Sequence, residues 1–596
     1  MTQESYTRDA RFEAHGAAVK WSPQHEAKWY DEKELRFHLA NEDWSDVLLI
    51  CHHAQFDGLI LSHHFGIKPK MWGCTLSMAR LLLGNHVSAS LDSVRKHFGI
   101  PSKTTPYNLF EGKHWNEMAV GTRELVAAGA CDEVESIWKI FCEFAKTFPA
   151  EEYDIVDTTI RMFTEPCLIG DSAVFAKIWQ EEAHKKATAM ERLGVTESEL
   201  QSADRFAALL REFGVDPATK DGQPSKVTGE VKQVYAFAKT DPFMEELLVD
   251  EDEDVRALAE ARLGVKSTLL QTRAETMGWM ASRGPLCVYL GYCAAHTSRW
   301  GGGDGSNFQN WTNGSEINSA IIAPDGFLIA EPDASQIECR LLNFCAGQWD
   351  KIDEFRDGGD PYIGVASAFY GYPVNKKDHP DERQLGKIVE LQAGYMSGGE
   401  KIRHTIRIKS KGKIILDESG GLKARDSYRG THPAVTAYWK EAGMVLKRML
   451  NWLSFDWGPF RIRCDVERGT RRIVLPNGVE LIYDTLEEFT DPEKNETFFR
   501  IKTRRGSVKT YSGKLVENII QALARVVISQ AMIRLKHLGY RIIMTKHDSL
   551  WVLIPKNDGR LEEHKHVILG EMSRELPWLP GCPLSAEFKT VGERYA

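Results

Sequence analysis

The sequence predicts a multidomain protein of mixed α/β and α+β class, and three observations support this. At 596 residues the chain is too long for one hydrophobic core, because domains usually contain about 100–200 residues. Short apolar runs alternate with helical patterns up to about residue 150, which is typical of an α/β domain. Farther along, apolar strands and hairpin signals accompany long helical stretches, which favours an α+β arrangement.

The first 150 residues contain two strand-like runs, at 14–20 and 47–51, and two helix-like runs, at 31–41 and 76–83. Residues 155–285 are rich in Ala, Glu, Leu and Lys at helical periods and should be mostly helical. This stretch separates the amino-terminal α/β region from the rest of the chain.

A glycine-rich loop begins at Thr297 and leads into an apolar strand that ends at Asp333. A helical region follows at about 350–455. The pair Asn477-Gly478 is a strong hairpin signal inside a strand-like stretch. The last expected elements are strands at 460–484, a helix at 514–537 and a hairpin whose bend is Lys546-His547-Asp548.

The composition is that of an ordinary globular protein, with 42% hydrophobic and 27% charged residues. We find no apolar stretch near the roughly 18 residues that a membrane span needs and no leader-like segment. The 11 cysteines are scattered singly, without a CxxC rhythm that would indicate zinc or a disulfide framework. We therefore expect a cytoplasmic enzyme with reduced thiols and no membrane partner.

The net charge of −9 argues mildly against indiscriminate nucleic-acid binding. Two windows, Lys401–Lys413 and Arg500–Lys514, are nevertheless strongly basic and contain no acidic residue. Such a run is often only a solvated surface. Because the two windows flank one candidate active site, we interpret them as a track for nucleic-acid phosphates.

Asp333 closes a buried strand and Asp548 lies at a hairpin bend, so both can project from one edge of a sheet. Paired carboxylates hold hard cations such as Mg²⁺, and two such ions can stabilise an in-line displacement at phosphorus. Arg383, Lys387 and Tyr395 recur at helical spacing between them, as a cationic surface for a triphosphate would require.

The segment 333–340, Asp-Ala-Ser-Gln-Ile-Glu-Cys-Arg, resembles the first palm motif of family A DNA polymerases, the polymerase I class. His547-Asp548 between apolar half-strands resembles the last palm motif, and residues 383–395 resemble the fingers helix. Thr297-Ser-Arg299 with residues 307–310 resembles the loop that touches primer-template. Residues 514–525 resemble a palm helix of the bacteriophage branch, so the likeness covers nearly the whole chain.

This resemblance implies a role for each matched residue. Asp333 and Asp548, with the backbone carbonyl of Ala334, would hold two Mg²⁺ ions, for which Mn²⁺ could substitute. Glu338 would exclude ribose, although Leu391 replaces the aromatic that supports this gate in the family. Ala334 and Ser549 also depart from the family, which often has an aromatic and a Glu there. The incoming nucleotide would meet Arg383, Lys387, Tyr395, Glu338 and Leu391, with Lys387 also catalytic, and the DNA would meet Arg299, Gln309, Asn310, Gln521 and His547.

The family also implies an order of domains. Residues 1–150 would form an RNase H-like 3′–5′ exonuclease-type domain and residues 151–596 a right-hand polymerase. Within the latter the thumb is expected at about 155–290, the palm at about 291–350 and 456–596, and the fingers at about 351–455. The implied partners are primer-template DNA, deoxynucleoside triphosphates and replication accessory proteins, in the cytoplasm of a phage-infected host.

The exonuclease-type region looks degenerate. Asp57 and Asp132 match two of the family's acidic positions, but Cys74 stands at another and Ala128 replaces a Tyr that orients water. No Asp-x-Glu pair precedes them. Either an internal start codon or true loss of the first strand explains this, and in both cases we expect weak or absent proofreading.

Two other functions stay open at this level. A single-subunit RNA polymerase shares the Arg, Lys and Tyr spacing and a His-Asp-Ser tripeptide, but its first palm motif lacks the string that ends here in Glu338. A catalytically silent primer-template binding protein would not need paired carboxylates, which weaken contacts to phosphates.

Overall fold

The computed structural model describes the chain apart from residues 85, 104–109, 223–229, 240, 249, 267–268, 312–313, 411, 492–495, 505 and 596. Its contacts divide the chain into two compact units. Unit 1 contains Met1–Cys167, Cys287–Asn310 and Pro324–Glu593, and unit 2 contains Leu168–Leu286, Trp311–Ala323 and Arg594–Ala596.

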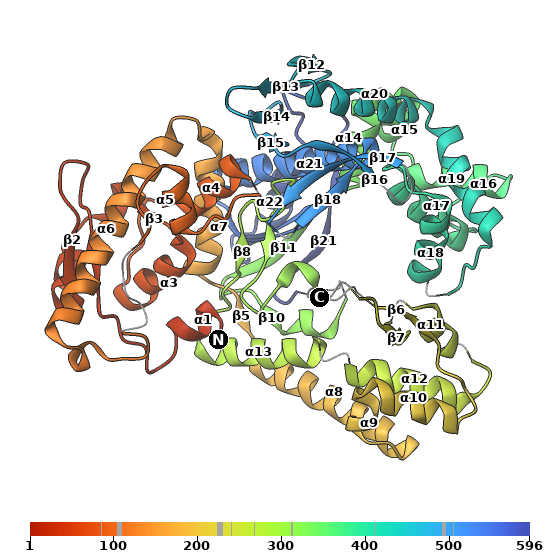
Figure 1. Ribbon diagram of the computed structural model, residues 1–596, viewed down its shortest axis with the longest axis horizontal. Helices are drawn as coiled ribbons and strands as arrows, with labels where there is room; N and C mark the ends of the chain where they lie inside the picture. Colours follow the sequence, from red (N-terminus) through yellow and green to blue (C-terminus); the bar gives the residue numbers. More distant parts are fainter. Residues whose placement is uncertain are drawn as a thin grey trace. The chain divides into compact units, whose positions relative to one another are not determined.

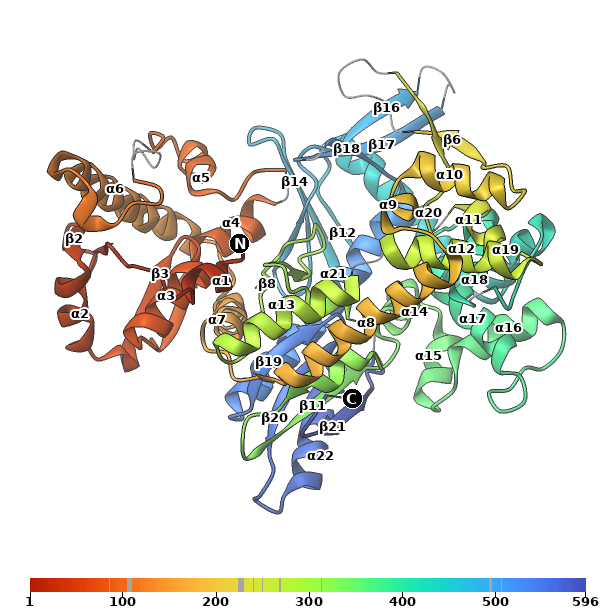
Figure 2. The same ribbon diagram turned by 90° about the horizontal axis from the view of Figure 1, so that it is seen from below.

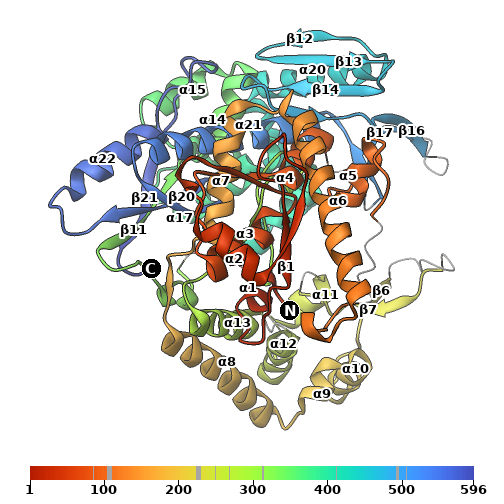
Figure 3. The same ribbon diagram turned by 90° about the vertical axis from the view of Figure 1, so that its left-hand side faces the viewer.

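The amino-terminal part of unit 1 holds short strands among helices (Figure 3). Strands β1 and β2 pair antiparallel, whereas β3 and β4 pair in parallel as a separate two-stranded sheet. The strands and helices expected before residue 100 are confirmed to within two residues. The elements are α1 (Gln3–Thr7), β1 (Gly16–Val19), β2 (Lys28–Asp31), α2 (Glu32–Ala40), η1 (Trp44–Asp46), β3 (Leu48–Cys51), α3 (Ala54–Phe65), β4 (Met71–Cys74), α4 (Thr75–Leu83), α5 (Leu91–His97), η3 (Trp115–Glu117), α6 (Val120–Ala145) and α7 (Ala150–Thr164).

The centre of unit 1 is a four-stranded antiparallel sheet in the order β19-β20-β11-β21, and Figure 1 labels its strands β11 and β21. Every residue of β20 up to Ile554 is buried, which matches the apolar run that predicted this hairpin. Helices α21 and α22 pack against the sheet and against each other. The elements are β11 (Phe327–Ala334), α21 (Ser512–His537), β19 (Arg541–Lys546), β20 (Ser549–Pro555), α22 (Leu561–Met572) and β21 (Ala586–Gly592).

Helices and two small sheets lie between β11 and α21 in sequence. Among the described residues, six helices, α15 to α20, cover the region expected to be helical at about 350–455, and α14 lies just before it. The Asn477-Gly478 turn joins β14 and β15 as predicted, with Gly478 at a positive φ of 86°. The bounds are α14 (Ile337–Ala346), α15 (Trp349–Arg356), α16 (Pro361–Tyr370), α17 (Pro380–Ala393), α18 (Gly399–Lys409), α19 (Glu418–Thr431), α20 (Pro433–Leu450), β12 (Phe455–Trp457), β13 (Phe460–Asp465), β14 (Thr470–Val474), β15 (Glu480–Ile482), β16 (Glu487–Asp491), β17 (Glu496–Thr503) and β18 (Gly506–Thr510).

A short loop segment of unit 1 precedes β11. Its strands β8 (Leu290–Gly291) and β9 (Gly301–Gly302) pair antiparallel, and the 3₁₀ helix η4 (Phe308–Asn310) follows them. This segment contains the glycine-rich stretch and all the residues expected to touch primer-template before β11.

Unit 2 is mostly helical, as the sequence predicts. Its helices α8 and α13 lie side by side (Figure 2), and its core is a cluster of apolar side chains on α9, α10, α11 and α12. The bounds are β5 (Ile169–Gly170), α8 (Ser172–Leu193), α9 (Glu197–Gln201), α10 (Ala203–Glu212), β6 (Thr219–Asp221), β7 (Gln233–Tyr235), α11 (Pro242–Leu247), α12 (Glu253–Lys266), α13 (Leu269–Arg283), η5 (Glu316–Ala320) and β10 (Ile321–Ile322).

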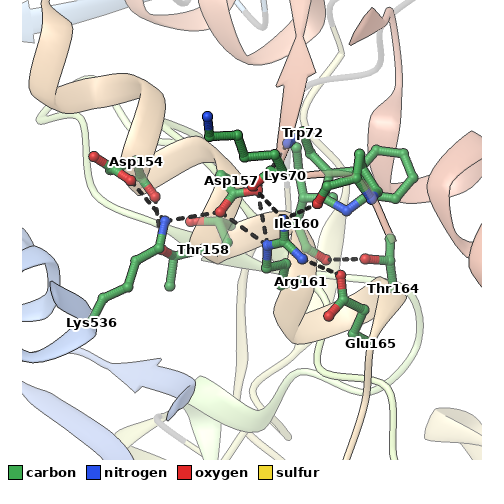
Figure 4. Close-up of polar contacts among 12 residues, drawn as sticks. Lys70, Trp72, Asp154, Asp157, Thr158, Ile160, Arg161, Thr164, Glu165 and Lys536 are labelled. Atoms are coloured by element: carbon green, nitrogen blue, oxygen red, sulfur yellow. Dashed lines mark hydrogen bonds and ion pairs between the residues drawn. The ribbon is translucent and has the colours of Figure 1, made fainter. Parts of the chain in front are cut away.

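Helix α7 joins the amino-terminal elements of unit 1 to its central layer through a buried polar network (Figure 4). Asp157, 1% exposed, accepts the backbone N–H of Trp72 at 2.8 Å and pairs with Lys536 at 2.9 Å. Arg161 also contacts Asp157 and donates to the carbonyl of Pro69 at 2.6 Å. A buried carboxylate with several donors is costly to disrupt, so this network holds β4, α7 and α21 together.

Helix α21 corrects one expectation. It is long and apolar enough to meet the usual criterion for a membrane span. However, most of its apolar stretch is buried inside the protein. Charged and polar residues are spread between its apolar ones, which concealed its high average hydropathy in the sequence.

Candidate active site

The sheet brings Asp333 and Asp548 together. Asp333 on β11 is the register partner of Ser549, the residue directly after Asp548. The backbone N–H of Ala334 also donates to the carbonyl of Asp548 at 2.9 Å. His547 takes a positive φ of 53°, which makes the tight bend between β19 and β20 that places Asp548 at the edge of the sheet.

The corner around these carboxylates is strongly negative. Burial raises the pKa of Asp548 to about 7, and the charges of Glu338 and Asp333 add to this. Burial also raises the pKa of Asp333, although an ion pair with Lys589 on β21 opposes the increase. Adjacent carboxyl groups that both have raised pKa values are typical of sites that bind cations.

Glu331 is a third carboxylate in this corner, and sequence reasoning missed it. It lies two residues before Asp333, is 1% exposed, and accepts a hydrogen bond from the Ser549 hydroxyl at 2.8 Å. Its other oxygen, Oε2, is buried and has no hydrogen-bond partner among the residues that the structure describes. A Glu inside the apolar run of β11 was the available signal, because a buried charge usually needs a reason.

Glu338, in the first turn of α14, links the carboxylates to two other predicted site residues. Its carboxylate accepts a hydrogen bond from the Tyr395 hydroxyl at 2.8 Å and forms an ion pair with Arg299 at 3.2 Å. Burial and the charge of Glu338 raise the pKa of Tyr395 well above its usual value. Residues 299, 338, 395 and 548 thus form one connected cluster.

Helix α17 carries Arg383, Lys387 and Leu391, and both Lys387 and Leu391 are exposed. Arg383 forms an ion pair with Asp360, the N-cap of α16, at 2.5 Å. Its guanidinium also lies 5.2 Å from the ring centre of Tyr362. Asp360 and Tyr362 are neighbours that the sequence did not indicate.

Tyr395 does not lie on this helix, contrary to the expected helical stripe. Helix α17 ends at Ala393, and Tyr395 occupies the turn that follows. The indole N–H of Trp439 donates to the carbonyl of Gly394 at 3.0 Å, and Met396 takes a positive φ of 63°. These contacts end the helix and turn Tyr395 toward Glu338.

The residues expected to contact DNA fall in two places. Gln309 and Asn310 lie on η4, where Gln309 is buried and Asn310 exposed. Burial lowers the pKa of His547, while a hydrogen bond with the backbone of Gln309 opposes this, so the two residues adjoin. Gln521 lies on α21 and donates to Glu517 at 3.2 Å.

The two basic windows occupy α18 and the hairpin β17–β18. Lys401, Lys409, Lys502, Arg504 and Lys509 are exposed. Arg500 instead pairs with Glu487 at 2.6 Å. Lys411 and Arg505, part of the same windows, lie outside the described residues.

In the amino-terminal region, Asp132 pairs with the buried Arg95 at 2.7 Å. Cys74 on β4 is the register partner of Cys51, and Ala128 is exposed on α6. Among the described residues, no group of three or more His, Cys, Asp or Glu side chains is arranged to hold a metal ion, here or elsewhere. Any metal in the β11 corner would therefore also need backbone or substrate oxygens.

Replacing Asp57 by Asn should stabilise the protein in a pH-dependent way. Burial raises the pKa of Asp57 to about 6, and the charge of Glu133 adds to this. A carboxyl with a raised pKa in the fold contributes full stability below its unfolded pKa of about 4 and loses it as the pH rises through about 6. We expect the free energy of unfolding of Asp57→Asn to exceed that of the wild type by about 1–3 kcal/mol at pH 8 and to match it at pH 4.

Urea unfolding at the two pH values measures this difference. Asp46→Asn is a matched control, because Asp46 is an exposed carboxylate in the same region. An equal change for Asp57→Asn at both pH values would contradict the assigned burial of the charge.

Comparison with known proteins gives relatives of one kind. No family model matches the chain. The DNA polymerase of Bacillus phage SP02 is 27% identical over 291 residues, which are 46% of this chain and 42% of that protein. The thermostable DNA polymerase I of Thermus aquaticus is 23% identical over 471 residues, or 76% of this chain and 50% of that protein. The chain therefore spans half or less of the length of these relatives.

A solved structure extends the likeness to the fold. The polymerase domain of Pol1 from M. smegmatis, determined in complex with DNA primer-template and dNTP, matches with a TM-score of 0.66 and 16% identity. The match covers 96% of this chain and 90% of that one. The described fold is thus that of a polymerase I-type polymerase domain.

A second phage protein is similar to part of the chain. A further match, at 25% identity over 141 residues, is the DNA polymerase of Mycobacterium phage D29. The chain is thus similar in sequence to DNA polymerases of phages and to bacterial DNA polymerase I, and similar in fold to a polymerase domain of the polymerase I type.

Proposed function

We propose that this protein is a template-directed DNA polymerase that adds deoxynucleotides to a primer 3′ end during phage replication. The observation that carries the proposal is the cluster around Glu338. This residue contacts Arg299 and Tyr395 directly and adds to the negative potential at Asp548. It therefore joins the carboxylate corner to the end of α17, where a triphosphate would lie.

Asp333 and Asp548, with the carbonyl of Ala334, would hold two Mg²⁺ ions, and Mn²⁺ could replace them. The residues suit hard cations, because the corner combines anionic oxygens with a buried, unpartnered oxygen of Glu331. When bound, the ions would neutralise phosphate charge and favour ionisation of the primer 3′-OH. The protein's part is to hold these carboxylates next to each other, so that a bound cation would relieve their mutual repulsion and favour their ionised form.

The nucleotide would bind along α17. Lys387 is exposed and free to reach a phosphate as a point charge, whereas Arg383 can offer its guanidinium fork once it leaves Asp360. Glu338, held by Tyr395, would lie against the sugar and exclude ribose. Leu391 cannot reproduce an aromatic support there, so selection against ribonucleotides would depend on the Glu338–Tyr395 hydrogen bond.

Primer-template would lie against Arg299, Gln309, Asn310, Gln521 and His547, with the exposed lysines and arginines of α18 and β17–β18 following phosphates. In family terms the central sheet is the palm, the helices of about 351–455 the fingers and the unit 2 helices the thumb. The amino-terminal region would be an RNase H-like exonuclease remnant with little or no proofreading. We also propose that the protein works with replication accessory proteins in the cytoplasm of the host.

Primer extension with dNTPs or rNTPs and Mg²⁺ tests this function. We expect templated extension with dNTPs and little with rNTPs. Efficient extension with rNTPs alone would instead indicate a single-subunit RNA polymerase. Tight primer-template binding without extension by either would indicate a silent binding protein.

Glu331→Gln should raise the Mg²⁺ concentration needed for half-maximal extension by about tenfold, because one buried negative charge beside the cation site is lost. The amide can still accept the Ser549 hydrogen bond, so the fold should persist. Metal affinity measured by Mn²⁺ paramagnetic resonance should fall in parallel. Glu587→Gln, a more exposed carboxylate on β21, is the matched control, and equal effects of both would contradict a specific role for Glu331.

A further inference from the structure

The first helix of the chain is joined to the loop that precedes η4. The carboxylate of Asp304 accepts the backbone N–H of Gln3 at 2.6 Å and that of Glu4 at 3.2 Å. Asp304 itself takes a positive φ of 53°, unusual for a residue other than glycine. About 300 residues separate the two segments in sequence, so this contact joins the start of the chain to the loop that carries Arg299 and Gln309.

Helix α1 is firmly held by the amino-terminal region. His64 on α3 contacts the carbonyl of Thr7 at 2.7 Å. Tyr6 stacks on Phe56 with ring centres 6.0 Å apart, and Glu4 is 1% exposed. The helix is thus a fixed part of this region, and a displacement of α1 would carry Asp304 with it.

Two more contacts join the same region to the segment just before this loop. The side-chain amide of Gln55 on α3 donates to the carbonyl of Leu290 at 2.9 Å in a buried setting. Arg80 on α4 donates to the carbonyl of Tyr292 at 3.4 Å. Because β8 pairs with β9 at Gly301–Gly302, these contacts support the loop through β9, while Asp304 is held directly by α1.

The other side of the loop meets the active site. Arg299 pairs with Glu338 at 3.2 Å, and His547 hydrogen-bonds the backbone of Gln309. Between them, the side chain of Asn307 packs against Gly302 and accepts the backbone N–H of Gln309 at 3.1 Å. A shift of Asp304 would therefore also move Arg299 and Gln309, which are proposed to touch DNA.

We propose that the amino-terminal region acts as a support that positions the loop 297–310 for primer-template binding, with Asp304 as the positioning residue. This rests on the proposed polymerase function. This role of the amino-terminal region is separate from nuclease chemistry, because none of these contacts uses Asp57 or Asp132. The support would act on DNA affinity rather than on the chemical step.

Gln3→Pro removes one of the two backbone N–H groups that donate to the Asp304 carboxylate, and so tests this contact. Gln3 is the first residue of α1, where Pro is tolerated, and Thr2 has the extended conformation that Pro requires before it. The ring removes the N–H and displaces the Asp304 carboxylate. Gln3→Ala is the matched control, because it removes the side chain and keeps the N–H.

We expect Gln3→Pro and Asp304→Ala each to raise the Kd for primer-template about 5- to 20-fold, with kcat within about threefold of wild type. Asp304→Asn, which keeps one acceptor, should recover part of the affinity. Gln3→Ala and Asp46→Ala should bind as the wild type does. In the Asp304→Ala background, Gln3→Pro should add nothing, because the contact is already absent.

Fluorescence anisotropy on labelled primer-template gives Kd, and single-turnover extension gives the rate. Unchanged Kd for both Gln3→Pro and Asp304→Ala, with a wild type that extends primers, would overturn the support while leaving the polymerase function intact. Equal losses in kcat and affinity, or additive effects in the double variant, would also overturn it. A wild type that extends no primer would instead refute the proposed function itself.

Discussion

Asp548→Asn should reduce the rate of nucleotide addition at least about 10³-fold, equivalent to about 4 kcal/mol of transition-state stabilisation. The reason is electrostatic. Asp548 is half-buried, and its burial together with Glu338 and Asp333 creates a negative corner that only cations can relieve. Asparagine would keep the shape of the bend between β19 and β20 but would remove the negative charge that holds the cations.

Single-turnover extension at saturating primer-template measures this loss without interference from DNA release. Asp558→Asn is a matched control, because Asp558 is a carboxylate in an exposed turn beyond β20. Primer-template affinity of Asp548→Asn should stay within a few-fold of wild type. A variant that extends at more than a tenth of the wild-type rate would remove Asp548 from the catalytic centre.

Lys387→Ala should lower kcat/KM for the incoming nucleotide about 10²-fold, or about 2.7 kcal/mol. Lys387 is exposed on α17, and its ammonium lies 5.9 Å from the ring centre of Tyr362, near Arg383. Among the described residues, no carboxylate forms an ion pair with Lys387, whereas Arg383 pairs with Asp360. Its charge is therefore available to a triphosphate without breaking an ion pair.

Lys440→Ala, at an exposed lysine of α20, is the control for a change in overall charge. Lys387→Arg should restore only part of the activity, because a planar fork does not replace a point charge. If Lys387→Ala lost primer-template affinity but kept its kcat/KM for dNTP, the lysine would belong to the DNA track instead.

The strands and turns near Asp333 and Asp548 could be predicted from local patterns. An apolar run closing on Asp333, and two half-strands around His547-Asp548, need only period and turn chemistry. Their side-by-side placement follows from β11 pairing with β20, although nothing local requires the Asp333–Ser549 register. The resemblance to a family predicted that Asp333 and Asp548 share one site, which their spacing in the sequence alone did not.

Other features depend on contacts between distant residues. The end of α17 before Tyr395 is set by Trp439, 45 residues farther along. Lys589 reaches Asp333 across 256 residues, and Asp304 reaches Gln3 across 301. Such pairs leave no periodic trace in a single sequence. Glu331 did leave one, as a charge inside an apolar strand, but only the fold shows that it meets Ser549.

The most direct test of the account is single-nucleotide incorporation opposite each of the four template bases, with Mg²⁺ and the wild-type protein. We predict that only the complementary dNTP is added efficiently to the primer 3′ end, and that its ribonucleotide counterpart is added far more slowly. Absence of incorporation, or addition that does not depend on the template base, would contradict a template-directed DNA polymerase.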